Sequence, residues 1–265
     1  MSRHITTRIT MLLGLLAVTY PLAANAQAFP GPKIKDAPPG SIRVLATVAI
    51  MEPLEAVRLQ AERAIGKAIV IEYGSARGNL KDKVLAGDAF DAAILLPDVD
   101  DGLVAAGKGS PERYPIASVD TAIGLRGDVE SVDVSTPAAL REALLKARSV
   151  KYSPTGVSLY TVRKLLDQFD IADKIHDSSH ATTQVELGKG EYEIDLFPVS
   201  EILANKKLRN LGRVIEPLQV PTVIEAIIGS HAADRTATLK LIRFFQSAAL
   251  DTPLRAAGMD RPPQK

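Results

Sequence analysis

Four short segments of the chain combine small residues with hydroxyl groups, and this combination suits the binding of an anion. Glycine lets the backbone come close to a ligand, while hydroxyl and free N–H groups donate hydrogen bonds to its oxygen atoms. The segments span residues 46–49, 74–78, 152–156 and 197–201. Glycine and serine also suit ordinary turns and helix caps, but their recurrence in both halves of the chain favours a shared ligand site.

The candidate ligand contacts in these segments are mostly small or hydroxyl-bearing. Arg77 is the exception, because its planar guanidinium could form two parallel hydrogen bonds with a carboxylate. The other candidates from the turns are Thr47, Ser75, Ser153, Thr155 and Gly156. Together these residue types predict a site for a small oxyanion or carboxylate.

One histidine could carry a proton if the site is catalytic. His180 stands in a hydroxyl-rich stretch, directly before a predicted helix, where it could donate to an anion, transfer a proton or simply lie on the surface. The other histidines, at positions 4, 176 and 231, have no partner at metal-ligand spacing.

Several classes of site lack their signatures in this sequence. The chain contains no cysteine, which rules out disulfides, thiolate metal sites and thiol catalysis. The acidic cluster at 98–101 lacks the rest of a calcium loop, and neither a nucleotide fingerprint nor a G-x-S-x-G elbow occurs. Lys and Arg number 32 against 31 Asp and Glu, so no overall charge favours nucleic acid. We therefore expect no metal and no cofactor.

The elements that must position the four segments alternate between strand and helix. Apolar, β-branched runs predict strands at 42–49, 68–73 and 90–96, and apolar residues at helical spacing predict helices at 52–65, 79–86 and 99–106. Near-continuous apolar strands alternating with helices indicate a parallel sheet covered on both faces.

The pattern changes near residue 117. A strand at 117–125 is predicted to cross into a second unit, with strands at 149–153 and 194–197 and helices at 136–147, 157–169 and 183–187. Returning strands at 214–218 and 223–230 and a closing helix at 237–248 bring the chain back. We therefore predict a two-lobed α/β protein, with residues 42–122 and 214–265 in lobe 1 and residues 123–213 in lobe 2. Ligands of open α/β sheets bind beyond the carboxyl ends of the strands, where the four segments fall.

The first 26 residues have the pattern of a secretory signal peptide. Arg3 and Arg8 precede an apolar run at 11–24, and Ala24 and Ala26 are small residues that suit a cleavage site. The run is shorter than the roughly 20 residues that a membrane helix needs. We expect cleavage after Ala26, a proline- and glycine-rich linker at 27–41, and a soluble periplasmic protein.

Four stretches of the chain resemble the periplasmic molybdate-binding proteins and their relatives, the type II periplasmic binding proteins of ABC importers. They are IRVLATVAIMEPLEAV, IEYGSARGNLKDKVLAGDAFDAAIL, GKGEYEIDLFPVSEI and LKLIRFFQSAALDTPLRAAGM. The resemblance implies two lobes, each with a mostly parallel sheet flanked by helices, and a ligand cleft between them. It also implies capture of a small anion and delivery to a membrane permease. We expect a monomer.

The oxyanion contacts of that family fall on residues of different chemistry in this chain. The family's first serine falls on Ala49, its second turn on Ser75 and Ala76 with an extra residue near Arg77, and its tyrosine on Pro198. The resemblance thus adds these positions to the candidate site. Loss of a hydroxyl and a phenol beside a gained arginine favours a carboxylate over molybdate, since an unmet buried polar group costs about 1–3 kcal/mol.

A second resemblance is to bacterial aconitate isomerase, through IMEPLEAV, SVKYSPTGVSLYTVRKLL and VSEI. Such an enzyme moves a double bond by taking a proton from one carbon and returning it to another, which needs carboxylate clamps and one base. The resemblance implies clamps at Arg77, Ser75, Thr155 and Gly156, with His180 or Glu201 as the base. The sequence thus leaves open a solute-binding protein, which we favour, an isomerase that interconverts cis- and trans-aconitate, and, as the least favoured alternative, a sensor subunit with no transport role.

Overall fold

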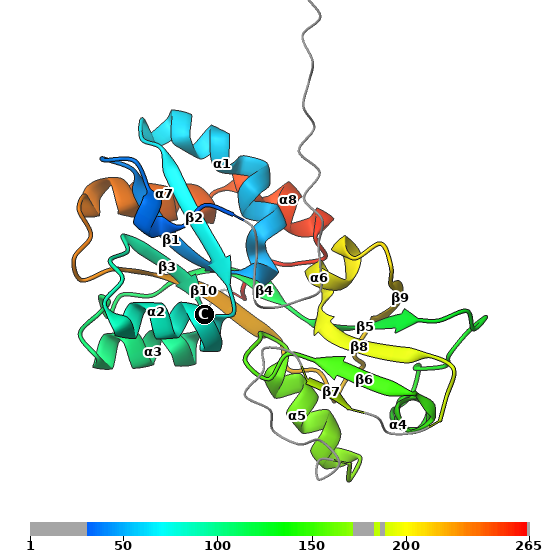
Figure 1. Cartoon of the computed structure of the whole chain (residues 1–265). Coiled ribbons are helices and arrows are strands. Elements are labelled where there is room, and N and C mark those ends of the chain that lie inside the picture. Colours follow the sequence, from blue (N-terminus) through cyan, green and yellow to red (C-terminus); the bar gives the residue numbers. More distant parts are fainter. Residues whose placement is uncertain (1–30, 172–182, 186–188, 264–265) are drawn as a thin grey trace, which may run out of the picture.

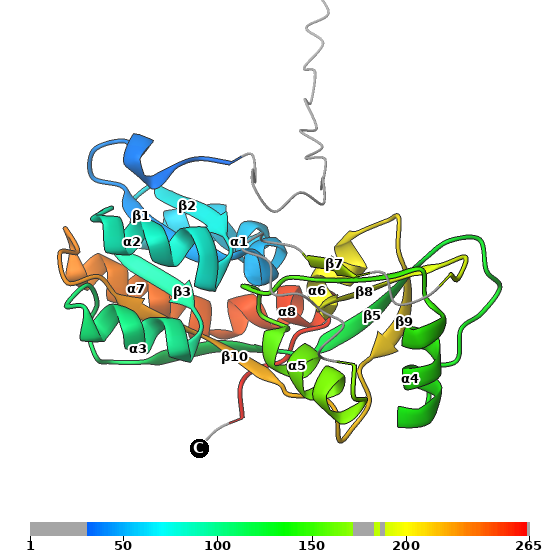
Figure 2. The same ribbon diagram turned by 60° about the horizontal axis from the view of Figure 1, so that its bottom comes forward.

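The computed structural model describes residues 31–171, 183–185 and 189–263. In these residues the chain forms two five-stranded sheets that lie side by side, each with its own helices (Figure 1, Figure 2). This arrangement confirms the two-lobed α/β fold that the sequence predicts.

The first sheet has the strand order β2-β1-β3-β10-β4. Its strands are β1 (Ile42–Thr47), β2 (Ile69–Gly74), β3 (Ala92–Leu95), β4 (Tyr114–Val119) and β10 (Thr222–Ile228). β1 pairs in parallel with β2 and β3, whereas β10 runs antiparallel to its two neighbours, β3 and β4. Four of the five strands therefore run in one direction, as the apolar runs predicted.

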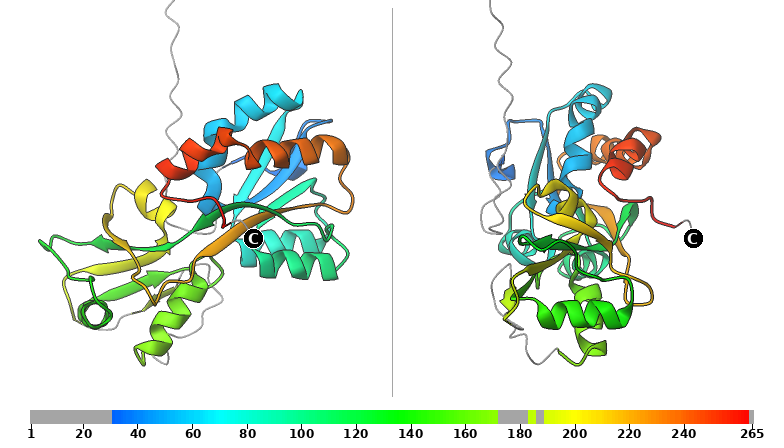
Figure 3. Two further views of the ribbon diagram at one scale, coloured as in Figure 1. Left: turned by 180° about the vertical axis from the view of Figure 1, so that it is seen from behind. Right: turned by 90° about the vertical axis from the view of Figure 1, so that its right-hand side faces the viewer.

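Helices cover both faces of the first sheet. They are α1 (Met51–Ile65), α2 (Lys81–Ala86), α3 (Pro97–Ala105), α7 (Arg235–Gln246) and α8 (Asp251–Ala256), with the short turns η1 (Ile34–Asp36) and η5 (Ala248–Leu250). α1, α7 and α8 pack together on one face, and α2 and α3 lie on the other (Figure 3). The core between these layers holds fully buried apolar side chains such as Leu45, Ile94 and Phe245.

The second sheet has the order β7-β6-β8-β5-β9 and mixed strand directions. Its strands are β5 (Thr121–Arg126), β6 (Ser149–Tyr152), β7 (Thr183–Val185), β8 (Glu193–Pro198) and β9 (Arg209–Arg213), and its helices are α4 (Pro137–Lys146), α5 (Leu159–Gln168) and α6 (Val199–Ala204). β6 and β8 are parallel, and the other pairings are antiparallel. This sheet is therefore less parallel than the first.

Two connections join the sheets. Residues 117–125, predicted as one strand, form β4 in the first sheet and β5 in the second, with Asp120 between them. The chain returns through residues 214–221, which connect β9 to β10. The expected crossing out of the first unit is confirmed, but the crossing strand is divided between the two sheets.

Two predicted elements are wrong. The helix expected at 183–187 is instead the strand β7, which pairs antiparallel with β6, because a free sheet edge decides the conformation of a short segment that carries β-branched residues. The strand expected at 214–218 is irregular chain. Val214 and Leu218 are buried in the second core, so their apolar character reflects burial alone. The true strand, β9, precedes it and is mostly polar and exposed, so it lacks a strand's apolar pattern.

Candidate functional site

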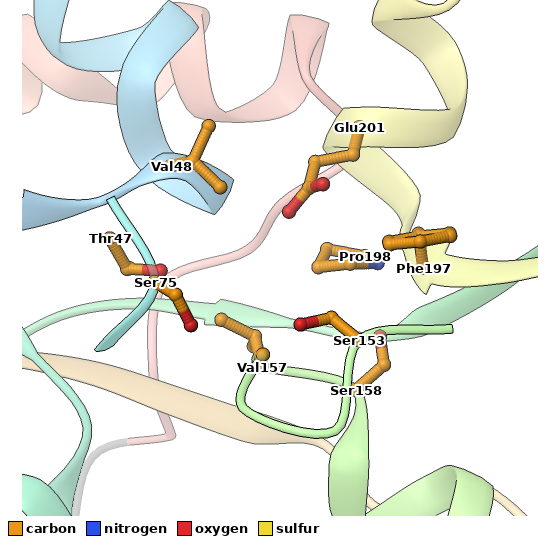
Figure 4. A pocket seen from close by; sticks show the side chains of 10 residues that line it. Thr47, Val48, Ser75, Ser153, Val157, Ser158, Phe197, Pro198 and Glu201 are labelled. Atoms are coloured by element: carbon orange, nitrogen blue, oxygen red, sulfur yellow. The ribbon is translucent and has the colours of Figure 1, made fainter. Parts of the chain in front are cut away.

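A cleft lies between the two sheets and is lined by residues of both (Figure 4). Its empty volume is about 490 Å³, with the open mouth included. The first lobe contributes Thr47, Val48 and Ser75, and the second contributes Ser153, Gly156, Val157, Ser158, Phe197, Pro198 and Glu201. The lining thus combines hydroxyl groups, apolar side chains and one carboxyl group.

The carboxyl ends of four strands bring these residues together. β1 and β2 are a parallel pair in the first sheet, and β6 and β8 are a parallel pair in the second. Beyond the four ends the chain turns into η2 (Val48–Ile50), which leads into α1, into the helical turn η3 (Ala76–Leu80), and into α5 and α6. The four segments singled out by the sequence therefore meet in space, as strand ends of open α/β sheets do.

The residues that begin these helical segments do not cap them with their side chains. Thr47, Ser75, Ser158 and Pro198 are the N-cap residues of η2, η3, α5 and α6, and none caps its segment with a side-chain hydrogen bond. Away from the cleft, the N-cap side chains of α4 and α7 accept hydrogen bonds from the third residue beyond them, at 3.1 and 2.9 Å. Of these four side chains, the hydroxyls of Thr47 and Ser158 thus remain without a described partner, whereas the Ser75 hydroxyl bonds to Thr155.

The interior of the cleft holds polar side chains without partners among the described residues. The hydroxyl of Ser158 is buried and makes no hydrogen bond there, and neither Thr47 nor Ser153 makes a described side-chain bond. In Figure 4 the Ser153 hydroxyl and the Glu201 carboxyl point toward the middle of the cleft. Because buried polar groups are normally hydrogen-bonded, unpaired ones in a cavity indicate a place for ligand or water.

Glu201 is the one charged residue in the described lining. Its carboxyl group has no ion pair or hydrogen bond with a described residue, and burial raises its pKa to about 7. The group therefore exchanges its proton near neutral pH, which suits either a hydrogen bond to a ligand or the transfer of a proton.

The rim of the cleft is different, because its polar groups bond to one another across the two lobes. The hydroxyl of Ser75 lies 2.7 Å from the hydroxyl of Thr155 and 2.9 Å from its carbonyl oxygen. The backbone N–H of Arg77 donates to the same carbonyl at 3.2 Å. These contacts hold the second turn of lobe 1 against the third turn of lobe 2.

The side chain of Arg77 completes this rim instead of facing a ligand. Its guanidinium forms two hydrogen bonds with Asp98, at 2.7 and 2.9 Å, and a third, of 2.6 Å, with the carbonyl of Gly156. It also lies over the ring of Tyr160, 4.7 Å from the ring centroid, and Tyr160 donates to Asp98 at 3.3 Å. Arg77 thus binds a carboxylate of the protein, that of Asp98, and not one of a ligand.

The structure places the other candidates as follows. Thr47, Ser75, Ser153, Gly156, Pro198 and Glu201 line the cleft. Thr155 bonds to Ser75 at the rim, and Ala49 and Ala76 are buried in the first core, where the Ala49 carbonyl accepts a 2.7 Å hydrogen bond from Ser200. His180 lies outside the described residues. Sequence reasoning missed Val157 and Ser158, which extending the third turn to its helix start would have reached. It placed Val48 and Phe197 in the first and fourth segments without naming them as contacts.

The cleft provides hydrogen-bond donors for an anion but no positively charged side chain. No lysine or arginine occurs in the described lining, and no group of three metal-ligating side chains occurs in the described part of the chain. A bound anion would be held by neutral hydroxyl and backbone groups, helped by the positive ends of helix dipoles. None of the described helices has the length and apolarity to span a membrane.

Comparison with known proteins supplies a family and a fold. Residues 42–260 match the family model described as bacterial extracellular solute-binding protein. An aconitate isomerase from Pseudomonas sp is 22% identical over 94% of this chain and 95% of its own.

Solved structures share the arrangement of the two lobes. The sulfate-binding protein SubI from Mycobacterium tuberculosis superimposes with a TM-score of 0.63 at 14% identity, covering 83% of this chain and 86% of its own. The periplasmic molybdate-binding protein of Azotobacter vinelandii superimposes with a TM-score of 0.57 at 15% identity, covering 84% of this chain and all of its own. At such identities these structures establish the fold only.

Proposed function

This chain belongs to the family of bacterial extracellular solute-binding proteins, and we propose that it captures a small oxyanion or organic carboxylate in the cleft between its lobes. It would then deliver the ligand to the membrane permease of an ABC-type importer. The observation that carries this proposal is the set of unpaired hydroxyl groups at the converging strand ends. Such groups, without a cation beside them, can hold an anion reversibly.

The chemistry of the lining favours a carboxylate over a metal oxyanion. Val48, Val157, Phe197 and Pro198 make much of the cleft surface apolar. A tetrahedral oxyanion presents only oxygen atoms, and those facing apolar side chains would lose the hydrogen bonds they have in water. A carboxylic acid instead presents carbon to such a surface and oxygen to the hydroxyls.

The location and organisation of the chain form part of the same proposal. Residues 1–26, which would be a signal peptide cleaved after Ala26, lie outside the described residues. Residues 42–122 and 214–265 would form one lobe and 123–213 the other, with the joint close to Asp120. The mature protein would work as a periplasmic monomer. Recovery of periplasmic protein that begins at Gln27 would support this, and intact protein confined to the cytoplasm of its host would refute it.

A thermal-shift panel tests the ligand class. It compares molybdate, tungstate, sulfate, phosphate, citrate and both aconitate isomers. A ligand present at a hundred times its dissociation constant stabilises the folded protein by about 2.7 kcal/mol. We expect organic acids to raise the melting temperature more than molybdate does, and a response to molybdate alone would reverse this assignment.

An isomerase acting on aconitate is the second candidate. It is supported by the likeness to aconitate isomerase over most of the chain and by the carboxyl of Glu201, which exchanges a proton near neutral pH inside the cleft. Incubation with cis-aconitate would then yield the trans isomer, and Glu201→Gln would lower turnover by about 10²–10⁴. If the protein binds aconitate but does not convert it, the isomerase is refuted and the binding function stands.

A further inference from the structure

Glu201 places a carboxyl group inside a cleft that is proposed to bind anions, where a negative charge is unfavourable. The described lining contains no cation that could neutralise it, and the carboxyl group makes no ion pair with a described residue. A fully ionised ligand beside a charged Glu201 would be repelled, since like charges in a partly buried site are only weakly screened. The ligand or Glu201 must therefore carry a proton at their contact.

The position of Glu201 is fixed by the residues on either side of it. Ser200 donates a buried 2.7 Å hydrogen bond to the carbonyl of Ala49 in lobe 1. Val199 and Ile202 are buried in the core that is centred on the first sheet. Since three of the first four residues of α6 are anchored in this way, the side chain of Glu201 is held at the cleft and points into it (Figure 4).

The rest of the cleft lining has complementary chemistry. Ser153 and Ser158 present hydroxyl groups that lack described partners, and the Ser158 hydroxyl is buried. Val157 and Phe197 add apolar surface. The lining thus offers donors for a carboxylate, a surface for a short carbon skeleton, and one acceptor.

We propose that Glu201 determines the ligand class by accepting a hydrogen bond from a hydroxyl group of the ligand, so that the cleft selects a small hydroxycarboxylate over the same acid without the hydroxyl. This inference rests on the proposed function of the cleft as an anion site. A hydroxyl on the ligand lets Glu201 remain charged without facing bare negative oxygen. The same contact would reject inorganic anions that carry no proton.

Matched pairs of acids test this selection by calorimetry on the mature protein. Malate is compared with succinate, and citrate with tricarballylate, at pH 8, with sulfate and molybdate as proton-free anions. Because a hydrogen bond to a charged group contributes a factor of about 10 to 150 in affinity, each hydroxy acid should bind better than its partner by that factor. Equal affinities within both pairs, or tighter binding of sulfate or molybdate, would overturn the inference.

The pH dependence of the same pairs gives a readout that needs no variant. Between pH 6 and pH 8 the free Glu201 carboxyl passes from mostly protonated to mostly charged. Succinate should lose affinity over this range, because Glu201 loses the proton that lies between its carboxyl group and that of the ligand. Malate should keep its affinity, because its hydroxyl group donates the hydrogen bond. The preference for malate should therefore widen by about 10-fold as the pH rises, and a preference that does not change with pH would contradict the mechanism.

Glu201→Gln removes the charge and keeps the shape of the side chain. We expect this variant to bind succinate and malate with similar affinity and to lose the pH dependence, while the exposed control Glu130→Gln behaves like the wild type. A Glu201→Gln protein that retains the full preference overturns the inference, although the cleft would still be an anion site. Failure of the wild type to bind any anion in the panel would instead overturn the proposed function itself.

Discussion

The rim and the interior of the cleft use similar residue types in opposite ways. At the rim, Ser75, Arg77 and Thr155 bond to one another or to nearby groups of the protein, so the two lobes are held together. In the interior, Ser153 and Ser158 have no partner among the described residues. Under the proposed function, closing the cleft and binding the ligand are therefore separate tasks, assigned to residues only a few positions apart.

Removing the two interior hydroxyls should have the largest effect on binding. The double variant Ser153→Ala/Ser158→Ala breaks no described hydrogen bond of these side chains, so the fold should keep its stability. Each lost bond to a charged ligand costs about 1.5–3 kcal/mol. Affinity for the best ligand of the panel should therefore fall by about 100-fold or more in calorimetry.

The control for this experiment is Ser135→Ala, which removes an exposed hydroxyl whose one hydrogen bond among the described residues is to Asp133. It should leave ligand affinity unchanged. Unchanged affinity in the double variant as well would mean that the ligand does not use the interior.

Glu201→Gln should stabilise the ligand-free protein at alkaline pH. Burial raises the pKa of Glu201 from its ordinary 4.5 to about 7, so the folded state holds this proton more tightly than the unfolded state. In the wild type, the protonated carboxyl therefore contributes its full stability below pH 4.5, and this contribution is lost as the pH rises through 7. At about 1.4 kcal/mol for each pKa unit, the variant should gain about 3 kcal/mol at pH 8 relative to pH 4.

Urea unfolding of the wild type and the variant at the two pH values measures this difference. The exposed control Glu130→Gln should show no such pH-dependent gain. A Glu201→Gln variant that is equally destabilised at both pH values would show that the carboxylate is paired in the folded protein.

At the rim, Arg77→Lys should speed ligand release. Lysine keeps the charge but cannot form the two parallel bonds to Asp98 while also bonding to Gly156. The lobes should separate more easily, and the dissociation rate in stopped-flow should rise by about 10-fold, or about 1.4 kcal/mol. Arg243→Lys, on the outer surface of α7, should not change it. A changed preference among ligands would instead place Arg77 in contact with the ligand.

The smallest effect is expected at Tyr160, which lies at the outer edge of the rim. Tyr160→Phe loses the 3.3 Å bond to Asp98 but keeps the ring beside Arg77, whereas Tyr160→Leu loses both. An exposed cation–π contact contributes about 0.5–1 kcal/mol. The leucine variant should therefore release ligand a few times faster and the phenylalanine variant nearly at the wild-type rate. The reverse order would show that the hydrogen bond matters more than the ring.

Much of the site could be predicted because the position of a strand end fixes the position of the turn that follows it. Apolar runs identify β1, β2, β6 and β8, and the turns that follow them must gather at the carboxyl ends of the strands. Thr47, Ser75 and Ser153 line the cleft for this reason. The fold class follows from the same alternation of strands and helices.

The role of Arg77 could not be predicted in this way. Its partners, Asp98 and Tyr160, are distant in sequence, and nothing in the local pattern shows that they come within reach. Ala49 and Ala76 were assigned by resemblance, but both belong to the first turns of helical segments and face the core. Contacts between distant segments decide which polar group remains free, and a local pattern contains no information about them.

The placement of β10 has a consequence for how the polypeptide can be divided. β10 supplies the shared neighbour of β3 and β4, yet it follows the entire second sheet in the chain. A polypeptide that ends before residue 222 would leave a gap inside the first sheet, whereas residues 121–213 contain every strand of the second. The second sheet is therefore built from one continuous segment of the chain. The first sheet is complete only when β10 joins it, so the half that is begun first is completed last.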